Sequence, residues 1–306
     1  MRWFDDKLLL VSMIGVVLLL LGIAWVLPQG LDVVPQSALL SQSVDMPYAL
    51  HVFGNSAISL EKIRVKVVYF IPQDPDFERD FGEGMPNLSA YERVWREPDF
   101  DEITRHLQQT VFSQIETFHA REFDSRSSLV FDIHPTPVHG LRDGDFYGGQ
   151  FLLIENPMPL QALELELNER LFSGSGDLFD ARFAQVEEDE YTVTLIVYVA
   201  SLPVVRIAGE EQLVSGIVGE FGPPALIFSP VVDPLFKYSA FSNSASIIYH
   251  ELLHAMGVPE QYDLLASDAL RQRDTRGDVF GRGTEQPLLN TYVGQDIKQQ
   301  MGFPAR

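Results

Sequence analysis

The 306-residue chain contains no cysteine, and this absence excludes several kinds of chemistry. Disulfides, cysteine-ligated zinc, iron–sulfur clusters, thiol catalysis and a lipid-modified N-terminal cysteine cannot occur. Basic residues are scarce too, because 22 lysines and arginines stand against 43 aspartates and glutamates, for a formal net charge of -21. A surface of that sign repels nucleic acid and anionic lipid, so we expect no nucleic-acid partner for the folded body.

Long apolar runs are missing as well, with the exception of Leu8–Leu27, which carries no charge. At about 1.5 Å per residue this run spans roughly 30 Å, the thickness of a bilayer core. A cleaved signal peptide is the alternative, but its apolar region is usually about 7–15 residues long and ends in an A-x-A-like site, which is not found close by. Arg2 and Lys7 precede the run and the next basic residue is Lys62, which favours a cytoplasmic N-terminus and an extracytoplasmic body.

The rest of the chain alternates between strand-like and helix-like patterns, which predicts an α+β fold with α/β-like layers. We predict a transmembrane anchor over 1–27, a stalk over 28–58 and one folded domain over 59–306. Strands are expected at 63–71, 129–134, 191–200 and 225–229. Helices are expected at 101–120, 160–171, 244–256 and 293–301.

The segment His250–Asp263, with the sequence HELLHAMGVPEQYD, carries the clearest chemical signal. His250 and His254 are four residues apart in a predicted helix, so both imidazoles project from one face and can bind a single cation. Glu251 lies beside the first histidine, within reach of a water on that cation, and is predicted to be a general base. Gly257 tolerates a positive φ, so we expect it to end the helix and turn the chain back.

A catalytic zinc ion needs three protein ligands and one open position for water, so a third ligand is expected beside the two histidines. The turn at Gly257 brings Glu260 towards the face that holds the imidazoles, and we predict Glu260 as this ligand. Asp263 is the reserve candidate. Glu285 is a more distant one, if the ligand comes from a separate element.

The other histidines give weaker signals. His134 and His139 flank a proline-rich loop without an acidic partner at a fixed spacing, and we interpret them as surface residues. His51, His106 and His119 stand alone. The chain has no GxSxG, no phosphate loop and no Rossmann fingerprint, so other catalytic classes have no support.

This stretch resembles the metzincin metallopeptidases, whose motif is HExxHxxGxxH. The matching residues are His250, Glu251, His254 and Gly257. The chain departs from the motif at Glu260, where the family has His or sometimes Asp. An acid at that position, followed by Tyr262 and Asp263, is similar to the immune inhibitor A group.

The resemblance implies a zincin- or metzincin-like mixed sheet with an active-site helix, and Zn2+ as the metal. It also implies a hydrophobic turn beneath the metal, for which Gly277–Gly281 is the counterpart, with Phe280 where the family has Met. In that architecture the strand just before the zinc helix is the sheet edge, to which a substrate peptide adds as another strand. We expect Ala225–Ser229 to be that strand.

We therefore expect a membrane-anchored, zinc-dependent endopeptidase that acts on polypeptides outside the cytoplasm. His250, His254 and Glu260 hold the metal in this interpretation, and Glu251 is the base. A zinc hydrolase of a non-peptide substrate is one alternative, and an edge strand open along the cleft distinguishes the peptidase from it. A non-catalytic surface or interaction protein with a decayed zincin fold is the other. The presence of Glu251 opposes decay, whereas the replaced Met and third His mildly favour it.

Overall fold

The computed structural model describes residues 59–73, 100–144, 146–147, 158–187, 189–200, 204–207, 210–213, 216–219, 222–232, 243–258 and 277–303. All of them belong to one compact unit, Pro47–Arg306. The predicted anchor and stalk lie outside the described residues, as do the candidate ligands Glu260 and Asp263. Within the described ranges, no helix combines the length and the apolar character needed to cross a bilayer.

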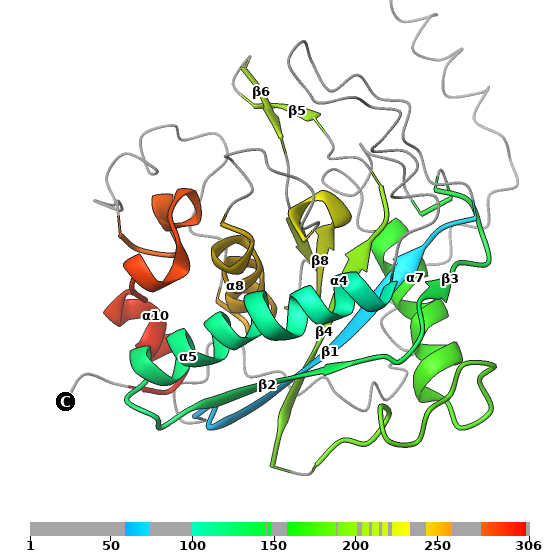
Figure 1. Ribbon diagram of the computed structural model, residues 1–306, viewed down its shortest axis with the longest axis horizontal. Coiled ribbons are helices and arrows are strands. Elements are labelled where there is room, and N and C mark those ends of the chain that lie inside the picture. Colours follow the sequence, from blue (N-terminus) through cyan, green and yellow to red (C-terminus); the bar gives the residue numbers. More distant parts are fainter. Residues whose placement is uncertain are drawn as a thin grey trace, which may run out of the picture. The chain divides into compact units, whose positions relative to one another are not determined.

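A six-stranded sheet forms the centre of this unit, with its main path in the order β2-β1-β4-β8-β7 and β3 paired with β1 beyond the end of β2 (Figure 1). Its strands are β1 Lys62–Ile71, β2 Ser128–Ile133, β3 Val138–His139, β4 Tyr191–Tyr198, β7 Gly216–Gly219 and β8 Gly222–Phe228. All pairings are parallel except that of β7 with β8. A separate antiparallel pair is formed by β5 Val204–Ile207 and β6 Glu210–Leu213.

The central strands β1 and β4 are buried on both faces, as their nearly continuous apolar sequences indicate. All eight residues of β4 are buried. On β1 the two faces differ, because alternate side chains point to opposite sides. One side holds the apolar residues Ile63, Val65 and Val67. The other holds Lys66, which is only 1% exposed and whose Nζ lies 2.7 Å from Asp132 of β2. Pairing of this buried cation avoids the large cost of an isolated charge.

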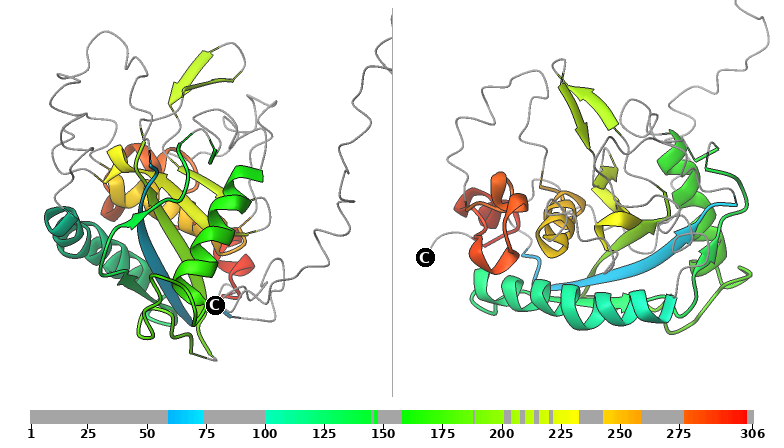
Figure 2. Two further views of the ribbon diagram at one scale, coloured as in Figure 1. Left: turned by 90° about the vertical axis from the view of Figure 1, so that its right-hand side faces the viewer. Right: turned by 45° about the horizontal axis from the view of Figure 1, so that its top comes forward.

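Helices cover both faces of the sheet (Figure 2). A long helical stretch consists of α4 Phe100–His106, a π-helical segment Leu107–Phe112 and α5 Ser113–Glu122. The helix α8, Ser244–Ala255, packs on β8 and β7 and contacts α5. The helix α7, Met158–Leu167, continues into a π-helical segment, Asn168–Phe172, and lies on the opposite face of the sheet. The helix α10, Gln295–Gln300, is the last one among the described residues.

The predicted α+β class is confirmed, and each predicted strand and helix has a counterpart within a few residues. The expectation that Ala225–Ser229 forms the sheet edge is wrong. These residues belong to β8, which lies between β4 and β7, and β7 is the edge among the described strands. Strand β7 was missed because its four residues, GIVG, begin and end with glycine, which is depleted in strands.

Candidate metal centre

Helix α8 carries the HELLH segment, and its sequence explains why it is held firmly. Away from the face that carries the two histidines, the surface of α8 is rich in apolar residues. These residues are buried against the sheet and α5. The buried apolar residues are Ala245, Ile247, Ile248, Tyr249, Leu252, Leu253 and Ala255. A helix with so broad an apolar surface is fixed in rotation, so the direction of its polar side chains is fixed as well.

The helix ends as the glycine predicts. Gly257 has a φ of 92°, in the left-handed region that favours glycine. Its amide donates to the carbonyl of His254 at 2.8 Å, and the next amide, that of Val258, donates to Leu253 at 3.1 Å. These two bonds define a Schellman turn, and the buried Val258 packs at its end.

The two histidines of the motif lie with their outer ring nitrogens facing each other. The distance between Nε2 of His250 and Nε2 of His254 is 3.2 Å. Two nitrogen ligands at about 2.0–2.1 Å from a tetrahedral zinc ion are separated by about 3.3–3.4 Å. The spacing of the pair therefore fits one shared cation.

The hydrogen bonds formed by Nδ1 of each histidine determine which ring nitrogen carries the proton. Nδ1 of His250 donates to the carbonyl of Val279 at 3.1 Å, and Nδ1 of His254 donates to the carbonyl of Val258 at 3.0 Å. A carbonyl only accepts, so each Nδ1 holds a hydrogen, and Nε2 is the ring nitrogen that a neutral imidazole offers to a metal. This is the arrangement in which a second bond orients a metal-binding imidazole. Burial, and then the neighbouring His254, lower the pKa of His250 to about 3, which keeps it neutral.

A turn packed against the imidazoles forms the floor of the site. The ring of Phe280 is fully buried and lies 4.9 Å from the ring of His250, nearly parallel to it, and 4.5 Å from that of His254. The turn Gly277–Gly281 is tightened by Asp278, whose Oδ1 accepts the amide of Phe280 at 2.9 Å. Phe280 was predicted to lie beneath the histidine pair, and its ring contacts with both imidazoles confirm this position.

Glu251 lies on the side of α8 that meets the sheet edge. It is 9% exposed, and its side chain lies directly against Gly216 of β7. A Cβ at position 216 would lie 2.6 Å from Cγ and Cδ and 2.7 Å from Oε1 of Glu251. The carboxylate is thus close to the main chain of the strand that ends the described sheet.

The described residues do not supply a third ligand. Among them, no group of three His, Asp or Glu side chains could hold a metal ion. The distant candidate Glu285 is exposed, on the short 3-10 helix Arg282–Glu285, and does not join the pair. This outcome leaves Glu260 and Asp263, outside the described ranges, as the candidates from the sequence.

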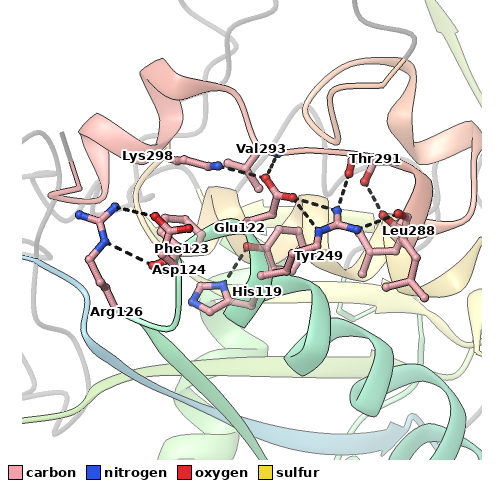
Figure 3. A network of polar contacts seen from close by, with 12 residues as sticks. His119, Glu122, Phe123, Asp124, Arg126, Tyr249, Leu288, Thr291, Val293 and Lys298 are labelled. Carbon is pink, nitrogen blue, oxygen red and sulfur yellow. Dashed lines mark hydrogen bonds and ion pairs between the residues drawn. The ribbon is translucent and has the colours of Figure 1, made fainter. Parts of the chain in front are cut away.

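His119, to which no role was assigned from the sequence, is buried and forms a hydrogen bond with a residue of α8 (Figure 3). Nε2 of His119 lies 2.8 Å from Oγ of Ser127, which itself donates to the carbonyl of Leu60. Nε2 is therefore the donor and Nδ1 accepts the hydroxyl of Tyr249, also at 2.8 Å. Burial lowers the pKa of His119 to about 3. In the sequence, its position on the same apolar face of the predicted helix as Ile115 was the available signal that it is buried.

The interpretation of His134 as a surface residue is wrong. It is 3% exposed, its Nδ1 lies 2.7 Å from the carbonyl of Thr136, and its ring packs edge-on against Phe183. Its partner in the predicted loop pair, His139, is exposed at the end of β3. The two therefore do not present a common surface.

Comparisons of this chain with protein-family models, with curated proteins and with solved structures found no match.

Proposed function

We propose that the chain is a membrane-anchored, zinc-dependent endopeptidase with a metzincin-like fold. The observation that carries the proposal is the histidine pair of α8, whose Nε2 atoms face each other at 3.2 Å while each Nδ1 donates to a backbone carbonyl. At that distance the two Nε2 atoms can bind one shared cation. The neutral state of His250 suits this role, because a metal ligand must be deprotonated.

The identity of the metal follows from the donor set. Neutral imidazoles suit zinc, copper, iron and nickel, and a carboxylate third ligand together with HExxH is typical of catalytic zinc. In the proposal Glu260 completes the set and Asp263 is the reserve. Zinc bound there supplies Lewis acidity at a scissile carbonyl and lowers the pKa of a coordinated water towards about 7.

The residues of the chain then divide the remaining tasks. Glu251 takes a proton from the attacking water and passes it to the leaving amine. Glu251 lies against β7, the edge strand of the described part of the sheet, and in the proposal an extended peptide adds to β7 as a further strand. Phe280 keeps the imidazole planes fixed from below. A carboxylate base and a neighbouring strand edge together favour a polypeptide substrate over a non-peptide one.

The membrane part of the proposal depends on the sequence of Leu8–Leu27. An apolar run of that length inserts as a single span, and the basic residues before it favour a cytoplasmic N-terminus. The folded unit and its metal centre are then extracytoplasmic, where a peptidase meets secreted or membrane-bound polypeptides.

The test compares the full chain in detergent with its Glu251→Gln variant. We expect one zinc per chain in both, and cleavage of an unstructured protein by the parent alone, with a loss of at least ~10²-fold in the variant. Gln keeps the shape of Glu but cannot accept the proton. A variant that lost its zinc would make Glu251 a ligand instead of a base. Zinc bound without cleavage of any polypeptide would favour a non-peptide substrate or the decayed, non-catalytic form.

A further inference from the structure

Gly216 stands at a place where backbone conformation does not require glycine. The described glycines with a positive φ are Gly257 and Gly302, and Gly216 is an ordinary extended residue of β7, paired with Ile227 of β8. A side chain would therefore be allowed by the backbone. The reason for glycine must lie in the space around it.

That space is filled by Glu251. A Cβ at position 216 would meet three atoms of this one side chain at 2.6–2.7 Å, well below the 3.0 Å that real Cβ contacts respect. Helix α8 packs on both β7 and β8, so the backbone of Glu251 cannot move away as a unit. Any side chain at 216 must displace the carboxylate.

We propose that Gly216 is a positioning residue for Glu251. The missing side chain lets the carboxylate lie against the main chain of β7. The steric coupling between the two positions depends on this contact alone, and its catalytic consequence also rests on the proposed peptidase function.

The size of the effect follows from the distances. An ordinary contact of about 3.4 Å or more requires Glu251 to shift by about 0.8 Å from its present place. A misplacement of about 1 Å in an active site can cost ~10²-fold in rate. We expect Gly216→Ala to lower kcat by about 10–100-fold, with KM and zinc content nearly unchanged, since neither a ligand nor a strand hydrogen bond is removed.

A double-mutant cycle tests the coupling without reference to activity. The full chain in detergent, stripped of metal with a chelator, is melted as the parent, Gly216→Ala, Glu251→Ala and the double variant. Overpacking of this kind should lower Tm by roughly 3–10 °C in the parent background. In the Glu251→Ala background, where the obstructing atoms are gone, the same change should have little effect. An equal loss in both backgrounds, or no loss in either, would overturn the proposal.

Gly174→Ala is the matched control, because a Cβ there meets nothing within 4 Å. It should leave both Tm and kcat unchanged. If the melting cycle shows coupling but no variant cleaves peptides, the contact stands and the peptidase function fails. If kcat falls in Gly216→Ala while the melting cycle shows no coupling, Gly216 does not act through Glu251.

Discussion

Replacement of Gly257 by alanine would separate the folding role of the α8 turn from its role at the metal centre. The backbone φ of 92° is disfavoured for a residue with a Cβ, by about 1–2 kcal/mol. For a folded unit of this size, 1 kcal/mol shifts Tm by about 2–4 °C, so we expect a loss of roughly 2–8 °C. The strain falls on a turn whose next carbonyl, that of Val258, orients His254.

The second effect of Gly257→Ala is on the metal. A change of the left-handed turn moves the carbonyl of Val258, which accepts Nδ1 of His254 at 3.0 Å. Loss of such an orienting bond typically weakens metal affinity by about 10–100-fold. Zinc affinity is measured by competition with a chromophoric chelator, and stability by thermal melting of the metal-free protein.

Gly302 offers a control in the same motif. It has a φ of 87°, and it ends α10 in a second Schellman turn, with bonds from Gly302 to Gln299 and from Phe303 to Lys298. Gly302→Ala should therefore lose a similar amount of stability with no change in zinc affinity. The reasoning is refuted if the two variants weaken zinc binding equally, or if Gly257→Ala binds zinc as tightly as the parent.

Three further changes extend the test. Glu260→Ala should weaken zinc binding by orders of magnitude and Asp263→Asn by only about 10–100-fold in the same chelator assay; the reverse order would make Asp263 the ligand. Phe280→Ala should cost about 3–5 kcal/mol in urea unfolding, whereas Phe280→Met should cost less than about 1.5 kcal/mol and keep zinc, because it retains most of the volume. Burial lowers the pKa of His119 to about 3, so its contribution to stability is complete above about pH 6.5 and is lost as the pH falls towards 3. The loss in the free energy of unfolding is roughly 2 kcal/mol at pH 5. His119→Gln should remove this loss from the pH profile of unfolding.

Most of the fold could be predicted because its elements are long and strongly patterned. The composition of the β4 segment, YTVTLIVY, predicts a buried strand without any information from the rest of the chain. The apolar stripe from Ile103 to Phe118 predicts a helix. Short elements whose sequences lack a strong strand pattern could not be predicted. The edge strand β7 and the hairpin of β5 and β6 have only four residues per strand, and partners rather than propensity determine them.

At the site, residues close in sequence could be predicted, and residues that meet only through the fold could not. The spacing of His250 and His254 dictates their common face on any helix. Gly216 and His119, in contrast, approach α8 from other elements, and nothing local predicts their contacts with Glu251 and Tyr249. Phe280 was expected beneath the pair, and it contacts both imidazole rings.

Helix α5 connects the two halves of the candidate site without contributing a ligand. His119 accepts the hydroxyl of Tyr249, the residue just before His250, and so holds α8. One turn further along α5, Glu122 accepts the amide of Val293 and the ammonium of Lys298, both at 3.0 Å, and so holds the C-terminal segment (Figure 3).

That segment also contains the floor of the site. Tyr292 exchanges backbone hydrogen bonds with the turn Gly277–Gly281, whose Phe280 contacts both imidazoles. Burial opposes ionisation of the Glu122 carboxyl, but its hydrogen bonds from Val293, Lys298 and Arg121 outweigh this effect and lower its pKa. Helix α5 therefore holds both α8 and the segment that carries Phe280, so the position of Phe280 against the two imidazoles depends on one helix.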